Sequence, residues 1–233
     1  MNRFLFLSIA VFSLAACRFR SGSGNIISEK RETAAFTGVS VSDGLEAEVR
    51  TGPVQEVVVE ADDNIIKSID ARVSDGILKI GIRGPHNYSN VHLKVYITAP
   101  EIVSIRASGG SDVDVTELLK SKGLLSFDAS GGAGILADLD APSVEVRASG
   151  GATVKLSGRT QNYDVDVSGG GEVSSGNLIT ENTVVRASSG SNAIVHASLS
   201  LKANASSGAE VVYTGGAVVQ KTVSSGGSVE KRN

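Results

Sequence analysis

The sequence predicts an all-β fold, a single-stranded parallel β-helix (β-solenoid) with coils of about 18–22 residues. Two observations lead to this fold class. From residue 102 onward, a motif of Ala or Val, Ser, Gly or Ser, and Gly occurs seven times at nearly constant spacing. A short segment of alternating apolar and polar residues stands before each copy, which is typical of a strand. The copies begin at Ala107, Ala129, Ala148, Val167, Ala187, Ala205 and Val223.

A unit of about twenty residues cannot bury an apolar face alone, so we expect the copies to stack and share one core. Stacked rungs about 4.8 Å apart would align equivalent residues in columns. We expect right-handed coils, the usual hand of parallel crossovers. The first residue of each copy would point inward. The last Gly would take a positive φ at a tight corner; this column is Gly110, Gly132, Gly151, Gly170, Gly190, Gly208 and Gly226.

The outward residue before each Ser alternates in charge along the predicted stack. If neighbours are about 5 Å apart, each Arg lies between carboxylates, which helps to fix the register. We expect a structural role for this column, because alternating signs suit neither a polyanion nor a polycation. The column runs Arg106, Asp128, Arg147, Asp166, Arg186, Asn204 and Thr222.

Residues 25–100 are predicted to form the N-terminal, β-rich part of the solenoid, and residues 101–233 its repeat part. The N-terminal part keeps strand character but lacks the Ser-Gly period, and 25–37 is expected to cap the first coil. Residues 64–68 are expected to add one helical turn. Turn signals separate the expected strands, which are 39–42, 45–51, 54–61, 69–73, 77–83 and 91–98.

Residues 1–16 are predicted to be a secretory signal peptide, because Arg3 precedes an apolar run too short to span a bilayer. The segment 14–17 (LAAC) resembles a bacterial lipobox, which implies cleavage before Cys17 and lipidation of that residue. The lipid would anchor the mature protein to a membrane, and 17–24 would be a flexible tether. Lipoproteins kept in the inner membrane tend to have Asp where this chain has Arg18, which favours the outer membrane of a Gram-negative bacterium.

Composition excludes several classes of protein. The 22 basic and 25 acidic residues give a formal net charge of -3, so no nucleic-acid partner is expected. One Cys excludes an intramolecular disulfide framework and a multi-cysteine metal site. The Gly-rich stretches lack the Lys and helix of a phosphate-binding loop. We predict no cofactor and no resident metal.

Several stretches resemble the bacterial GIN-domain family. They are 23–26 (SGNI), 36–44 (FTGVSVSDG), 57–64 (VVVEADDN), 75–80 (DGILKI) and the Ser-Gly-Gly repeats. The likeness covers about residues 23–233, and EADDN is its most specific part. The family is described as auto-transporter adhesin heads with β-helical folds. The resemblance implies a β-helix with an adhesin-like role and transfers no catalytic residues.

A polysaccharide-active enzyme of the pectin lyase-like β-helix type is the competing interpretation. It would use Glu60, Asp62 and Asp63 as general acid and base or as oxygen ligands of Ca²⁺. Asp62 and Asp63 also precede Asn64 at an expected turn, where such residues serve as caps and turn formers, and we favour this role. Few aromatic residues remain to stack on sugars.

The three histidines give no metal-ligand spacing. His86 and His92 flank a loop and could face each other, but exposed loop positions suit them better. His196 lies in a repeat strand and is expected to point outward.

We therefore predict a lipid-anchored β-solenoid of the cell envelope that acts as an adhesin or binding scaffold for glycan or protein partners, without catalysis. The membrane would be reached through the lipid on Cys17. A polysaccharide-active enzyme is the alternative, and a factor that binds lipid or cell wall is a third possibility.

Overall fold

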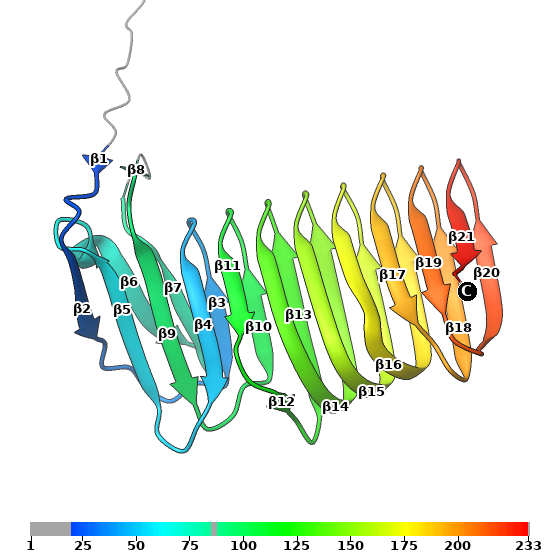
Figure 1. Ribbon diagram of the computed structural model, residues 1–233, viewed down its shortest axis with the longest axis horizontal. Helices are drawn as coiled ribbons and strands as arrows, with labels where there is room; N and C mark the ends of the chain where they lie inside the picture. Colours follow the sequence, from blue (N-terminus) through cyan, green and yellow to red (C-terminus); the bar gives the residue numbers. More distant parts are fainter. Residues whose placement is uncertain (1–19, 85–87, 233) are drawn as a thin grey trace, which may run out of the picture.

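The computed structural model describes residues 20–84 and 88–232, which form an elongated row of stacked coils (Figure 1). Two layers of strands face each other, and their inward side chains form one hydrophobic core. The one helical element among the described residues is the 3-10 helix η1 (Ile66–Ser68), close to the expected single turn. The predicted all-β solenoid is confirmed.

In the repeat part, each coil places one strand segment in each layer. The Ser-Gly motif forms a tight corner at the top of Figure 1, and a wider bend closes the coil at the bottom. The strands are β10 (Ser104–Ala107), β11 (Asp112–Val115), β12 (Leu119–Lys120), β13 (Leu124–Ser130), β14 (Gly134–Ser149), β15 (Thr153–Val167), β16 (Glu172–Ala187), β17 (Asn192–His196), β18 (Ser200–Ala205), β19 (Glu210–Thr214), β20 (Val218–Val223) and β21 (Ser228–Lys231).

Strands β14, β15 and β16 continue through the bend and contribute to both layers, since each has 15 or 16 residues. Neighbouring coils pair in parallel, and motif positions align as predicted, for example Ala107 with Ala129 and Ala129 with Ala148. Phe127 and Tyr163, expected to point inward, are buried in the core. The Tyr163 hydroxyl donates to Ser175 Oγ at 3.0 Å, which satisfies both buried groups.

The N-terminal strands form the same two layers in a different order. They are β1 (Arg20–Ser21), β2 (Ile26–Lys30), β3 (Gly38–Val41), β4 (Glu46–Thr51), β5 (Glu56–Asp62), β6 (Ile69–Ser74), β7 (Ile77–Ile82), β8 (Tyr88–Ser89) and β9 (Leu93–Ala99). The β3–β4 coil lies between β7 and β9 on one side and β10 and β11 on the other. All six strands expected in this part are present.

The outermost strands at this end pair in antiparallel fashion, which the sequence pattern did not predict. In the first layer, β5 pairs with β9 and β2 pairs with β5. In the second layer, β6 and β7 form a hairpin whose two-residue loop, Asp75 and Gly76, has positive φ at both positions. This is the geometry of a type I′ turn, which matches the twist of paired strands. Strand β2, within the expected cap, lies at the edge of the first layer.

Each repeat corner also has two consecutive residues with positive φ. Gly109 and Gly110 have φ of 61° and 74°, and Gly150 and Gly151 have φ of 62° and 77°. All seven glycines of the predicted Gly column take a positive φ. The corners form a ladder, because the last Gly of each of the first six copies donates to a carbonyl in the next corner at 3.0–3.2 Å.

The alternating charge column has the predicted register, with Arg106 opposite Asp128 and Asp128 opposite Arg147. The Arg side chains of the column form their ion pairs with carboxylates outside it, Arg147 along its own strand and Arg186 diagonally across strands. Arg147 pairs with Glu145, and Arg186 Nη1 lies 2.6 Å from Asp164 Oδ1. Arg147 lies between Asp128 and Asp166 in the register, as expected, but the ion pairs form with carboxylates of a second, neighbouring column.

The C-terminal coil is more exposed than the others. Val218 and Val223 of β20 are 80% and 46% exposed. Lys221, on an inward position, donates to the carbonyl of Val229 at 3.3 Å. The outer edges of β20 and β21 have no partner strand among the described residues.

Two glycine substitutions test the backbone account. Gly151→Ala is expected to cost about 1–2 kcal/mol, because φ is positive but no atom lies near the added methyl group. Gly158→Ala is expected to cost about 3 kcal/mol or more, because φ is 104° and the methyl group would overlap the Leu139 carbonyl oxygen. Urea unfolding followed by circular dichroism measures both, and equal losses would contradict the account.

Candidate functional site

The carboxylates of the acidic segment at the end of β5 are each engaged by other residues of the chain. Glu60 Oε1 lies 2.8 Å from Nε2 of His92, the residue just before β9. Asp62 is buried at the end of β5, and Asp63 lies just beyond it. Glu60 and Asp62 thus both bond to His92, Glu60 through the ring and Asp62 through the backbone N–H.

Asp62 accepts two backbone hydrogen bonds from segments far away in the sequence. His92 N donates to Oδ2 at 2.8 Å, and Gly24 N donates to Oδ1 at 2.7 Å. These bonds, with that of His92 the strongest, hold the pKa of Asp62 below its usual value. Asp62 thus ties the N-terminal segment and the β8–β9 connection to β5.

The two following residues extend this attachment. Asp63 accepts from Ser23 Oγ at 2.6 Å and from Asn25 Nδ2 at 2.9 Å, and these bonds lower its pKa. Asn64 accepts from Ser23 N at 3.2 Å and donates to the Ser21 carbonyl at 3.0 Å. We call Asp62, Asp63 and Asn64 the N-terminal clamp. The EADDN string therefore positions the start of the folded body.

Part of the segment expected to be a flexible tether, 17–24, is attached to the folded body. Cys17 and the predicted signal peptide, 1–16, lie outside the described residues. Arg20 and Ser21 pair with β8, and Gly22 N donates to the Ser89 carbonyl at 3.3 Å. Residues 20–24, expected to be flexible, are thus bound to the body.

Two of the three histidines can be placed. His92 is half-buried against Glu60, and His196 Nδ1 accepts from Thr180 N at 3.2 Å. His86, expected at an exposed loop position, lies outside the described residues. No group of three metal-ligating side chains with suitable geometry occurs within residues 20–84 and 88–232.

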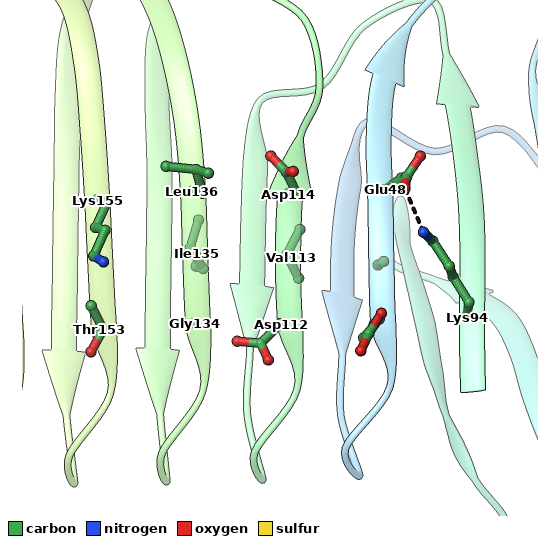
Figure 2. A pocket seen from close by; sticks show the side chains of 12 residues that line it. Glu48, Lys94, Asp112, Val113, Asp114, Gly134, Ile135, Leu136, Thr153 and Lys155 are labelled. Atoms are coloured by element: carbon green, nitrogen blue, oxygen red, sulfur yellow. Dashed lines mark ion pairs between the residues drawn. The ribbon is translucent and has the colours of Figure 1, made fainter. Parts of the chain in front are cut away.

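The outer surface of the first layer contains a shallow groove of about 510 Å³ across β4, β9, β11, β14 and β15 (Figure 2). Four carboxylates from two adjacent strands gather in it. We call it the acidic groove, and its charged side chains are Glu46, Glu48, Lys94, Asp112, Asp114 and Lys155.

Like charges stand directly opposite each other in the acidic groove. Glu46 is in register with Asp112, and Glu48 with Asp114, on strands about 4.8 Å apart. Such pairs destabilise a sheet. Lys94 offsets part of the charge, with Nζ 2.6 Å from Glu48 Oε1 and 5.2 Å from the centre of the Tyr96 ring. The hydrogen bond to Glu48 raises the pKa of Lys94.

The acidic groove is open beside Asp112, because the neighbouring position on β14 is Gly134. A methyl group at Gly134 would overlap the Asp112 carboxylate. Asp112 and Asp114 form no hydrogen bond through their side chains and no ion pair among the described residues. Both carboxylates therefore face solvent in the groove.

Sequence reasoning missed this groove, although a signal for it exists. Asp43 and Gly44 have φ of 66° and 74° and make the same corner as the repeats, with Asp in place of the first Gly. Counting two and four residues from Gly44 gives Glu46 and Glu48, and the same count from Gly110 gives Asp112 and Asp114.

No helix in the described part of the chain is long and apolar enough to cross a membrane.

Residues 35–217 match the family described as "Putative auto-transporter adhesin, head GIN domain". The chain belongs to this family. The predicted membership of the GIN-domain family is confirmed. The family description indicates an adhesin-like, binding role at the bacterial surface or envelope.

Solved structures share the fold over nearly their whole length. A "putative adhesin" of Bacteroides fragilis NCTC 9343 has a TM-score of 0.83 at 20% identity and covers 91% of this chain and 98% of its own. A "putative adhesin" of Parabacteroides distasonis ATCC 8503 has a TM-score of 0.75 at 21% identity, and the match covers 92% of this chain and 100% of that protein. A "putative lipid binding protein" of the same strain has a TM-score of 0.74 at 16% identity, and the match covers 93% of this chain and 100% of that protein. The comparison with curated proteins finds no match.

The clamp predicts a specific loss of stability in acid. The pKa of Asp62 is lower in the folded protein than the unfolded value of 3.8, so its stabilising effect is fully present above that value. The effect is lost as the pH falls through the folded pKa. Asp62→Asn is expected to lose roughly 1–3 kcal/mol at pH 7 and to show a smaller further loss below pH 4.

Urea midpoints between pH 7 and pH 3 measure this difference. Asp114→Asn is the matched control, because the Asp114 side chain forms no ion pair among the described residues and faces Glu48. Its stability at pH 7 should be unchanged or slightly higher. Equal losses in the two variants would contradict the assigned role of Asp62.

Proposed function

We propose that the protein is a lipid-anchored solenoid of the cell envelope that binds glycan or protein partners through its outer strand faces and catalyses no reaction. The observation that carries this proposal is the arrangement of outward side chains in fixed columns on two extended faces. An extended, charged surface of this kind suits binding through many contacts. Membership of an adhesin-like family supports the same role.

The state of the acidic segment supports a role without catalysis. General acid–base chemistry on sugars needs two carboxyl groups that flank one substrate bond. Asp62 and Asp63 instead accept hydrogen bonds from residues 23–25 and 92, and Glu60 faces His92. These groups serve the fold at the N-terminal clamp.

Anchoring through Cys17 is consistent with the position of the clamp. The clamp holds Ser21 and Ser23 at one end of the solenoid (Figure 1). Only residues 17–19 would then separate the lipid from strand β1, so the folded body would lie next to the outer membrane. Its long faces would remain accessible to a partner.

A lipid-modification assay tests the anchor. The wild-type chain expressed in a Gram-negative host should incorporate labelled palmitate and enter the detergent phase of Triton X-114. Cys17→Ser should abolish both, because the thioether cannot form. Ser23→Ala, six residues away, is the control and should retain both. Detergent-phase partition of Cys17→Ser equal to that of the wild type would overturn the anchor.

A combined binding and product-release assay tests the absence of catalysis. The full chain is incubated with a glycan panel, with and without Ca²⁺, and each sample is assayed for bound glycan and for new reducing or unsaturated ends. We expect saturable binding without product. The double variant Asp62→Asn and Asp63→Asn, studied below its unfolding temperature, should bind within about twofold of wild type. Both carboxylates bond to other residues of the chain, away from the strand faces proposed to bind the glycan. Product formed by the wild type and lost in this variant would establish the enzyme instead.

A further inference from the structure

The second layer contains a groove of about 330 Å³ near the N-terminal end, formed by β3, β6 and β7 and the corner after β10. It lies on the layer opposite the acidic groove. We call it the basic groove, and its polar lining includes Ser40, Asp70, Arg72, Lys79, Arg83 and Ser108.

Two guanidinium groups are held at the rim of the basic groove by one carboxylate. Asp70 is 8% exposed and forms ion pairs with Arg72 through Oδ2 and with Arg83 through Oδ1. Burial raises the pKa of Asp70, but hydrogen bonds and charge from Arg83, then Arg72, outweigh it and lower the pKa. The Arg side chains are 66% and 72% exposed, so each keeps N–H donors facing solvent.

A third cation stands beside this pair without a carboxylate of its own. Lys79 is directly opposite Arg72 in the β6–β7 hairpin, and its other neighbour is Ser40. Ser40 is in turn next to Arg106. Neither Lys79 nor Arg106 forms an ion pair within the described part of the chain. Like charges in register destabilise a hairpin, and a bound anion would remove that cost.

The floor of the basic groove is hollow and polar. Gly81 lies opposite Asp70, and a methyl group at Gly81 would come within 2.6 Å of Asp43 Oδ2 and Ser42 Oγ. Asp43 is already engaged, since Oδ2 accepts from Ser42 Oγ at 2.8 Å and from Ile82 N at 2.9 Å. Both carboxylates of the groove are thus bonded to the chain, while three cations face outward.

The surroundings of the basic groove favour a sugar polymer over a protein or a lipid. Protein interfaces have an apolar centre, and acyl chains need apolar surface. None of the large exposed hydrophobic residues of the described chain lies in this groove. Hydroxyl groups do, at Ser40, Ser42 and Ser108. Hydroxyls beside guanidinium and ammonium groups match a ligand with both hydroxyl and oxyanion groups.

We propose that the basic groove binds an acidic polysaccharide, with Arg72, Lys79 and Arg83 holding its carboxylate or phosphate groups and the serine hydroxyls contacting its sugar hydroxyls. This inference rests on the proposed binding function and names the class of ligand. Such a ligand is negatively charged, whereas the acidic groove would accept a positively charged one. The two layers would therefore bind different partners.

Calorimetric titration of the full chain in detergent micelles, at about 50 mM salt, tests the proposal. The probes are galacturonate hexamer and a neutral galactose hexamer. The wild type should bind the acidic hexamer at least tenfold more tightly than the neutral one, and affinity should fall as salt rises. Lys79→Gln should weaken binding of the acidic hexamer about tenfold through loss of a charge-assisted hydrogen bond, and Lys79→Arg should restore it.

Lys202→Gln is the matched control, because Lys202 is an exposed lysine of β18 in the same layer, far along the stack. It should leave affinity within twofold of wild type. Lys79 forms no ion pair, so its substitution is not expected to unfold the protein. Equal weakening by both variants would overturn the proposal, since the attraction would then come from the general charge of the layer.

Other probes distinguish the sources of an oxyanion. Inorganic phosphate should bind at least tenfold more weakly than the acidic hexamer, and phosphatidylglycerol vesicles should not compete with it. Phosphate binding as tight as that of the hexamer, or displacement by vesicles, would overturn a polysaccharide ligand. Binding of only neutral glycans or a protein partner would overturn the basic-groove proposal and leave the proposed function in place. Absence of every interaction would overturn both.

Discussion

The corner at the end of each coil is the constraint on which the rest of the structure depends. Two consecutive residues with positive φ, such as Gly109 and Gly110, turn the chain tightly from one layer to the other. The N–H of Gly110 then donates to the Gly131 carbonyl in the next corner. Because stacked corners align at one edge, the strands that leave them are fixed in register. A slip by one residue would move the inward side chains to solvent, so the buried core enforces the same register.

Fixed register gives each layer its own chemical surface. Two residues after a corner, Glu46 faces Asp112 on the first layer, and on the second layer Arg72 faces Lys79. Both arrangements place like charges side by side, which a sheet selected for stability alone would avoid. At the same end of the molecule the two faces therefore differ in the sign of their charge. A protein that binds by its surface can use such faces for different ligands, and the hydrogen-bonded corners supply the rigid support.

The repeat part could be predicted almost fully from the sequence, because the Gly column and the inward column follow from local backbone geometry and period-two alternation. The N-terminal end could not, since alternation identifies β5 and β6 as strands without naming their partners. The N-terminal clamp could not be predicted from the sequence either, because Asp62 bonds to Gly24 and His92, which are 38 and 30 residues away along the chain. The acidic groove was accessible in principle. It was missed because Asp43 replaces the first Gly of the corner and conceals the earliest copy of the pattern.

The central claim is that ligands bind on the strand faces that the register builds, and not at the acidic segment after β5. Amide chemical-shift mapping of the isotopically labelled protein, titrated with galacturonate hexamer, tests it most directly. The account predicts shifts concentrated on β3, β6 and β7, around Lys79 and Gly81, with little change at Asp62 to Asn64. Shifts centred on the N-terminal clamp, with β6 and β7 unaffected, would contradict the account and locate the ligand at the segment that a β-helix enzyme would use.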